Sequence, residues 1–309
     1  MTANADTTIP SLNYADDWPR IDSAVGYDPK REAFIADILA RMSLEEKVGQ
    51  MIQPDLREVT PDEVTEYKLG TILNGGGAFP GNDKYATAAD WAQAADTYYH
   101  AGDRAYEGRG FRVPFAWATD AVHGHNNVFG ATLFPHNIGL GAARDPDLVR
   151  RIGSATAAEI NATGLDWTFA PTVAVPRDYR WGRVYEGYSE DPSVVHAYAS
   201  AMVDGLQGQG GDRFGAGKVV STVKHWVGDG GTSNGVDRGD NHYTEAYLIN
   251  LHAVGYASAL DAGAQVVMSS FNTWHNDKNY DLTGTGNYNY KIHGSRYLIQ
   301  DVLKDKMGF

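Results

Sequence analysis

Residues 218–232 carry the feature that most constrains the fold, a buried strand that ends in charged side chains. Four of residues 219–223 are β-branched, which is typical of a strand buried in a parallel sheet. Lys224 and His225 follow without a break, and a glycine-rich loop then carries Asp229. Charged groups at the end of a buried strand are costly unless they are paired or used, and active sites of α/β proteins lie at that end. We therefore favour a functional site over the alternative, a structural ion pair between Lys224 and Asp229.

Segments with strand character alternate with segments of helical period along the chain. Strands are expected near residues 51–53, 70–74, 114–119, 167–173, 219–224 and 265–271. Helices are expected over residues 30–41, from the capping box that joins Ser43 to Glu46, and over 90–106, 145–164, 191–208, 244–263 and 296–307. This alternation predicts a parallel sheet with crossover helices.

The fold class that we expect is α/β, a TIM-type (β/α) barrel. Such a barrel has eight strands, and the sequence places six, so we expect a barrel that is incomplete at its C-terminal end. A doubly wound sheet is the structural alternative, although no G-x-G-x-x-G motif follows the first strand. No linker divides the chain. We therefore assign residues 1–30, which contain three prolines, to an N-terminal arm and residues 31–309 to one barrel domain.

Composition excludes several classes of partner. A net charge of −13 over 309 residues argues against nucleic acid and against an anionic membrane surface. The absence of cysteine excludes disulfides and a cysteine nucleophile. No stretch approaches the ~20 apolar residues of a membrane helix, and residues 1–30 contain no apolar run of the signal-peptide type. Because a chain without cysteine fits an exported protein, we expect a periplasmic or extracellular location and leave a cytoplasmic one open.

Polar side chains recur where the predicted strands end. Asp120 ends the strand at 114–119, Arg183 lies in the loop after the next strand, and Lys224 and His225 end the one after that. In a barrel these strand ends converge on one mouth. A cavity lined by Asp, Arg, Lys and His suits a ligand with many hydroxyls, because carboxylates accept and cations donate hydrogen bonds.

Several reaction classes have no support in the motifs of the chain. No P-loop, H-E-x-x-H or G-x-S-x-G motif occurs, which argues against phosphoryl transfer, zinc-dependent hydrolysis and serine acyl transfer. His123 and His125 lie two residues apart after a strand, and we expect them to form hydrogen bonds rather than to bind a metal. No metal and no cofactor is therefore expected.

Three strings of the chain together resemble glycoside hydrolase family 3. They are ATDAVHGH at 118–125, RWGRVYEGYSEDP at 180–192 and KHWVGDGGT at 224–232, in that order. The resemblance extends from about Trp18 to Phe309. Within the family the chain looks most like bacterial exo-β-glucosidases and the glucan glucohydrolases of plants.

The resemblance implies a binding site for a terminal glucose at the barrel mouth. Matched by motif, Asp120, Arg183, Lys224 and His225 hold the hydroxyls of that glucose. Phe271 takes the place of a tyrosine that the family commonly has near its nucleophile. The resemblance also implies a retaining mechanism with two carboxyl groups ~5–5.5 Å apart. The nucleophilic aspartate is expected beyond the last residue and the acid/base glutamate in a following domain, so no catalytic residue is expected in this chain.

The expected function is hydrolysis of terminal non-reducing β-D-glucosyl residues from β-glucans, cello-oligosaccharides or β-glucosides, with retention of configuration. The longer protein is expected to catalyse it, and the 309-residue chain alone to be inactive. A β-N-acetylhexosaminidase of the same family is an alternative, because Asp240-Asn-His242 has the form of its Asp-x-His pair. A non-catalytic carbohydrate-binding barrel is another. The sequence indicates neither the linkage preference nor the oligomeric state.

The backbone at the end of the central strand is expected to be irregular. Successive strand residues alternate between faces, so Lys224 and His225 can both face the cavity only if the chain departs from regular strand geometry. A non-proline cis peptide provides such a departure. Trp226 is then expected to pack into the scaffold.

Overall fold

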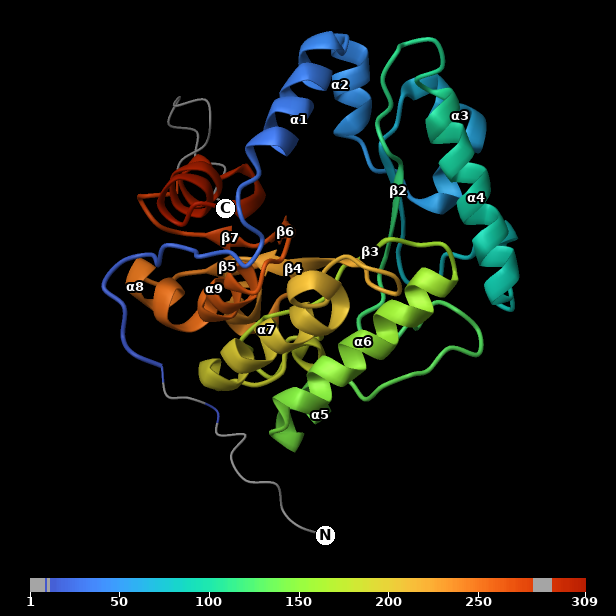
Figure 1. Ribbon diagram of the computed structural model, residues 1–309. Helices are drawn as coiled ribbons and strands as arrows, with labels where there is room; N and C mark the ends of the chain where they lie inside the picture. The colour runs from blue at the N-terminus through green and yellow to red at the C-terminus, as the bar shows by residue number, and fades with distance from the viewer. Residues whose placement is uncertain (1–8, 10–11, 280–290) are drawn as a thin grey trace.

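The computed structural model describes residues 9, 12–279 and 291–309, and Figure 1 shows how their helices and strands are arranged. One parallel sheet runs in the order β1-β2-β3-β4-β6, with β1 at Thr71–Asn74, β2 at Ala116–Thr119, β3 at Trp167–Thr168, β4 at Val220–Trp226 and β6 at Val266–Ser269. Each strand pairs with the next one along the chain in this sheet. A doubly wound sheet would reverse its order at a switch point. The sheet is therefore a half-barrel, as expected of an incomplete TIM-type barrel.

Helices follow the strands and cover the sheet. The described α-helices are α1 Pro29–Arg41, α2 Leu44–Gln50, α3 Pro61–Tyr67, α4 Ala88–Arg104, α5 Asn137–Ala143, α6 Pro146–Ala162, α7 Pro192–Gln207, α8 Glu245–Tyr247 and α9 Val254–Asp261. Two segments are π-helical, Leu248–His252 and Tyr297–Lys306. Short 3-10 helices occupy Leu56–Glu58, Pro80–Asn82, Val184–Glu186, Gly210–Asp212, Asp229–Gly231, Ser233–Gly235 and Ile292–Gly294. In Figure 1, α3 and α4 lie beside β2, while α6, α7 and α9 follow one another along the part of the sheet that contains β3 and β4.

The helix starts that the sequence predicts are confirmed by their caps. The Ser43 hydroxyl accepts the backbone N–H of Glu46, whose carboxylate accepts the backbone N–H of Ser43 in return. The Asp145 carboxylate accepts the N–H of Leu148 at the start of α6. These bonds satisfy N–H groups that have no partner inside the helix, and for this reason the local sequence locates the helix ends.

Several elements differ from the sequence-based expectations. Residues 51–53 do not form a strand, because α2 runs to Gln50 and Pro54 has no N–H to add to a ladder. An isolated parallel bridge then joins Asp55, just after this segment, to Leu73 of β1. The sequence reading also missed α3, α5 and a small second sheet, in which β5 at Asp240–Asn241 pairs in parallel with β7 at Thr273–Trp274. The helix expected over residues 244–263 is interrupted by a π-helical segment.

The core lies between the sheet and its covering helices, and Trp226 is one of its largest fully buried side chains. The ring of Trp226 packs edge-on against Tyr256 of α9, with ring centroids 4.9 Å apart. On its other side lies Trp18 of the N-terminal arm, at 5.7 Å. The arm is also fastened by its backbone, since the N–H of Ile21 donates to the carbonyl of Met307 at 2.8 Å. Residues 12–28 therefore pack on the half-barrel rather than extending from it.

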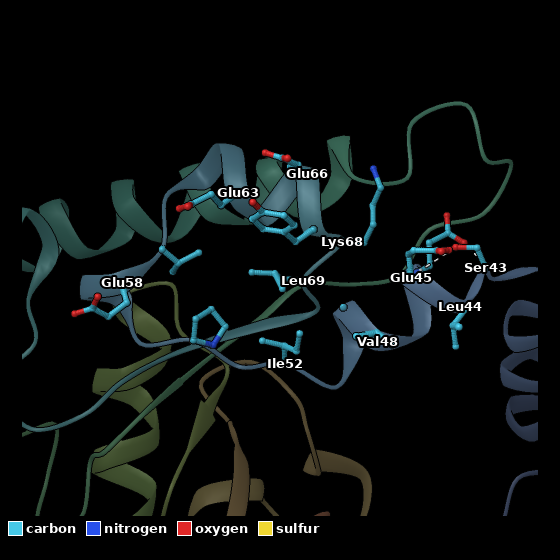
Figure 2. A pocket seen from close by; sticks show the side chains of 15 residues that line it. Ser43, Leu44, Glu45, Val48, Ile52, Glu58, Glu63, Glu66, Lys68 and Leu69 are labelled. Atoms are coloured by element: carbon cyan, nitrogen blue, oxygen red, sulfur yellow. Dashed lines mark hydrogen bonds between the residues drawn. The ribbon is translucent and has the colours of Figure 1, made fainter.

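An apolar groove of about 730 Å³ opens between α2 and α3. Figure 2 shows Leu44, Val48, Ile52 and Leu69 along it, with acidic side chains of α3 above. This groove lies on the β1 side of the molecule. None of its lining residues is among those that the sequence predicts to bind sugar. Among the described residues, no helix is long and apolar enough to cross a membrane.

Candidate functional site

A buried cation at the end of β4 contacts a carboxylate at the end of β2. The Nζ of Lys224 lies 2.9 Å from Oδ1 of Asp120, and the Lys224 side chain is only 5% exposed. Asp120 directly follows β2, where its N–H donates to the carbonyl of Asn74 in β1. The Asp120 side chain is 35% exposed, and a carboxylate has acceptor capacity beyond one lysine. This pair therefore places a hydrogen-bond acceptor and a cation at the carboxyl ends of β2 and β4.

Arg183 and Glu186 form a second ion pair beside the first. The Nε and Nη2 atoms of Arg183 donate to the two oxygens of Glu186 at 2.6 and 2.9 Å, a bidentate geometry that fixes the plane of the guanidinium. The same Nη2 lies 3.2 Å from Nε2 of His225. Burial works to lower the pKa of Arg183, but the hydrogen bonds and charge of Glu186 outweigh it and raise the pKa. Arg183 is thus a permanent cation held against the end of β4.

His225 is held from its other side by Asp229. The Nδ1 of His225 lies 2.8 Å from Oδ2 of the buried Asp229 carboxylate, whose Oδ1 accepts the N–H of Gly230 at 2.9 Å. Because Nε2 faces an arginine donor, Nδ1 carries the ring hydrogen and donates to Asp229. Burial works to raise the pKa of Asp229, but the bond from His225 and the charge of Arg183 overcome it and leave the pKa lowered. The imidazole is therefore fixed in both tautomer and orientation.

The backbone at the end of β4 has the irregularity that the sequence analysis expects. The Lys224–His225 peptide is cis, and so is Trp226–Val227. Lys224 and His225 both reach the polar cluster, whereas the Trp226 indole lies in the core and donates to the carbonyl of Leu298 at 3.1 Å. The alternative ion pair between Lys224 and Asp229 is wrong, since Lys224 bonds Asp120 and Asp229 bonds His225.

Four of the five residues expected to bind sugar lie together, and the fifth follows a neighbouring strand. Asp120, Arg183, Lys224 and His225 are linked by the contacts above and lie at the carboxyl ends of β2 and β4 or in the loop after β3. Phe271 follows β6, is 58% exposed and packs edge-on against His293 with ring centroids 5.3 Å apart. Phe271 therefore offers an apolar surface rather than a hydrogen bond.

Two carboxylates of the site, Glu186 and Asp229, did not appear among the residues predicted to bind sugar. Both are buried, and each is already bonded to a basic side chain of the cluster. In the sequence, each of these carboxylates lies close to the basic residue that it bonds. Glu186 follows Arg183 by three residues, and Asp229 follows His225 by four. They therefore orient the guanidinium and the imidazole of the cluster.

Of the two histidines after β2, His125 forms the hydrogen bond that the sequence predicts, whereas His123 packs against another ring. The Nε2 of His125 lies 2.9 Å from the hydroxyl of Thr163, and burial lowers the pKa of His125 to about 4. His123 packs edge-on against His136, with ring centroids 4.6 Å apart. His123 therefore belongs to a small aromatic group after β2.

The chain is similar to several known proteins. A family model, the glycosyl hydrolase family 3 N-terminal domain, matches residues 43–309. An exo-1,3/1,4-β-glucanase from a Pseudoalteromonas species is 48% identical with a TM-score of 0.87, over 96% of this chain and 35% of that one. A β-glucosidase from Listeria innocua, solved in complex with isofagomine, is 25% identical with a TM-score of 0.70, over 92% of this chain and 36% of that one. A periplasmic β-glucosidase of Salmonella typhimurium is 30% identical over 285 residues, 90% of this chain and 32% of that protein.

These matches cover the whole of the described site. The chain spans about a third of the length of each of these relatives. The matched residues include the whole half-barrel and every residue of the polar cluster described above. The chain belongs to glycosyl hydrolase family 3, and its residues 43–309 correspond to the N-terminal domain of that family.

Proposed function

We propose that this chain supplies the glucose-binding part of a hydrolase that removes terminal non-reducing β-D-glucosyl residues from β-glucans, cello-oligosaccharides or β-glucosides. The observation that carries the proposal is the polar cluster at the carboxyl edge of the half-barrel, in which Lys224 bonds Asp120 and Arg183 contacts His225. Support comes from the relatives, which are named as β-glucosidases and as an exo-1,3/1,4-β-glucanase.

Each group of the cluster has a role in holding the sugar under this proposal. Asp120 accepts bonds from hydroxyls with the oxygen capacity that Lys224 leaves free. Lys224 and Arg183 donate to the hydroxyl oxygens. Asp229 holds Nδ1 of His225, so His225 bonds a hydroxyl through Nε2 in exchange for its contact with Arg183. Charge-assisted bonds of this kind contribute more than bonds between neutral groups. A ligand that lacks one of these hydroxyls loses a charge-assisted hydrogen bond, so the site favours the full hydroxyl pattern of the sugar.

The chemistry under this proposal is retaining hydrolysis by two carboxyl groups that the longer protein supplies. One carboxylate forms the glycosyl-enzyme bond while an acid protonates the leaving oxygen, and water then releases the sugar with its configuration kept. Both buried carboxylates of the cluster, Glu186 and Asp229, are already bonded to basic side chains, which disfavours either as the nucleophile. A periplasmic or extracellular location forms part of the proposal, and the relative named as periplasmic supports it.

Two alternative functions remain for this chain. A β-N-acetylhexosaminidase would need Asp240 and His242 to work as a pair, but Asp240 contacts His275 at 3.3 Å and all three are exposed. That observation disfavours the alternative. A non-catalytic carbohydrate-binding barrel would keep the sugar contacts and lack turnover.

The test compares the 309-residue chain with a protein extended through the next strand and a following domain. Nitrophenyl β-D-glucoside and nitrophenyl β-N-acetylglucosaminide serve as substrates, and NMR of the product gives the anomer formed first. We expect the extended protein to cleave the glucoside, to release the β-anomer, and to exceed the short chain by several orders of magnitude.

Other outcomes discriminate among the proposals. Preference for the acetylglucosaminide supports the hexosaminidase. Binding of glucose or laminaribiose without turnover by the extended protein supports the binding barrel. Robust hydrolysis by the 309-residue chain would overturn the placement of the nucleophile outside it. Release of the α-anomer first would overturn retention.

A further inference from the structure

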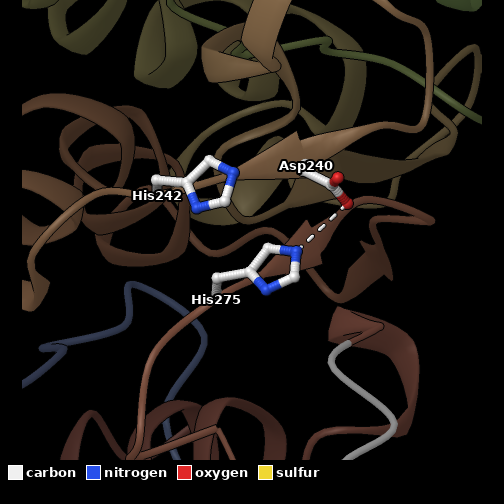
Figure 3. Close-up of side chains that lie close together, drawn as sticks. All are labelled: Asp240, His242 and His275. Carbon is white, nitrogen blue, oxygen red and sulfur yellow. Dashed lines mark ion pairs between the residues drawn. The ribbon is translucent and has the colours of Figure 1, made fainter.

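Three exposed side chains of types that can bind a metal ion lie close together on the surface. Asp240, His242 and His275 each offer a ligand atom, and these atoms all lie within 4.8 Å of one another. Figure 3 shows the two imidazoles and the carboxylate gathered together, with His275 directed at Asp240. The Nε2 of His275 lies 3.3 Å from Oδ1 of Asp240. None of the three belongs to the polar cluster at the ends of β2 and β4.

The backbone of a two-stranded ribbon places these side chains on one face. In the pairing of β5 with β7, Asp240 lies opposite Thr273 and Asn241 opposite Trp274, so His242 comes opposite His275. The N–H of His275 donates to the carbonyl of Asn241 at 2.9 Å and continues the ladder past the last paired residue. Side chains two apart on a strand share a face, which brings Asp240 and His242 to the same side. Strand pairing therefore brings the three side chains to one face of the ribbon.

The other face of the ribbon anchors it in the protein. Asn241 and Trp274 are fully buried. The Asn241 amide donates to the carbonyl of Gly228 at 2.7 Å, and the Trp274 indole donates to the carbonyl of Tyr243 at 2.9 Å. Rigid elements hold ligands more accurately than loops do. The exposed face thus presents its three ligands from a fixed base.

The ligand set and its spacing suit a divalent transition metal. Imidazole and carboxylate donors bind zinc at 2.0–2.2 Å, which sets neighbouring ligands of a tetrahedral ion ~3.3–3.5 Å apart. The separation between His275 and Asp240 lies in that range. The two imidazoles stack with centroids 4.6 Å apart and planes 12° from parallel. A shared metal must lie in the plane of each ring, so binding requires the stacked rings to rotate about χ2, which is a soft torsion in histidine.

We propose that Asp240, His242 and His275 bind one divalent transition-metal ion of the zinc class through two imidazole nitrogens and one carboxylate oxygen. The ion joins the segment after β4 to the segment after β6, because β5 and β7 belong to these two segments. Through Asn241 the ribbon is bonded to Gly228, next to the loop that carries Asp229. Water completes the coordination, as is common for three protein ligands. The proposal stands independently of the sugar that the protein binds.

The test is zinc binding by the metal-stripped protein, measured by calorimetry with zinc chloride. We expect one saturable site per chain and an increase in the melting temperature when zinc is added, because an ion that binds only the folded state stabilises it. His242→Ala, His275→Ala and the isosteric Asp240→Asn should each weaken the affinity by about tenfold or more and remove the thermal shift. His100→Ala, at an exposed histidine of α4, is the matched control and should bind zinc as the parent does.

Cobalt gives a second readout that does not depend on stability. Co²⁺ in the metal-stripped protein should give a visible absorption band that the His275→Ala variant lacks, while its circular dichroism matches that of the parent. The absence of a saturable zinc site in the parent would overturn the proposal. Unchanged zinc affinity in all three ligand variants would do so as well.

Discussion

Replacing Lys224 with methionine separates the role of this lysine in binding from any role in stability. The Lys224 ammonium is buried, with its side chain 5% exposed, and bonds Asp120 at 2.9 Å. Methionine has a similar length and fills the same space without the charge. Because Asp120 is 35% exposed, water can solvate its carboxylate once the lysine is gone.

The two effects of the change have different magnitudes. Burying an ammonium has a desolvation penalty that its ion pair offsets only in part, so Lys224→Met should alter the free energy of unfolding by less than about 1 kcal/mol. The sugar, in contrast, loses a charge-assisted donor, which contributes about 1.5–3 kcal/mol. That loss corresponds to a decrease in kcat/KM of roughly 10- to 150-fold.

Lys218 provides the matched control on the same segment. It lies just before β4, at the opposite end of the strand from Lys224, and its side chain is 16% exposed and 3.7 Å from Asp212. Lys218→Met should change the free energy of unfolding to a similar small extent and leave kcat/KM as in the parent. Urea unfolding and hydrolysis of nitrophenyl β-D-glucoside by the extended protein measure both quantities. Equal kinetic losses in the two variants, or unfolding of Lys224→Met alone, would refute the reasoning.

Two further predictions concern buried titratable groups next to the site. Asp229→Asn removes the charge that fixes His225, so kcat/KM should fall by about tenfold or more and the free energy of unfolding by about 1–3 kcal/mol, measured by kinetics and urea unfolding. Burial lowers the pKa of His252 to about 4. Below pH ~6.5 the unfolded chain therefore takes up a proton that folded His252 does not, and the free energy of unfolding should fall by about 2 kcal/mol between pH 7 and 5. A His252→Gln variant should lose this part of the pH dependence, and an equally steep profile in that variant would contradict it.

The sequence predicts helix starts well because their signals are local. Ser43 and Glu46 lie three residues apart, and the structure confirms the reciprocal bonds that this spacing implies. The same signal at Thr60 and Glu63 marks α3, which the sequence reading missed although the structure shows an equivalent capping box. Short-range chemistry therefore suffices to locate these helix starts.

The partners within the polar cluster are harder to predict than its members. A strand that ends in charged side chains indicates a site, and the structure brings four of the expected residues together there. Sequence spacing allows Asp229 to bond either Lys224 or His225 equally well. The choice depends on Asp120, which lies 104 residues before Lys224 and meets it only because β2 and β4 belong to one sheet. Such a pairing follows from tertiary contacts that no local pattern contains.

The pairing of β5 with β7 could not be predicted from the sequence either. Each strand contributes only two residues, too few for an alternating pattern to be read. From the sequence, His242 is the one partner expected for Asp240, and the two residues together suggest a catalytic pair. The structure adds His275 from a distant segment, at 3.3 Å from Asp240. That third side chain changes the chemistry open to the group, because one carboxylate and two imidazoles together supply the donors of the metal site proposed above.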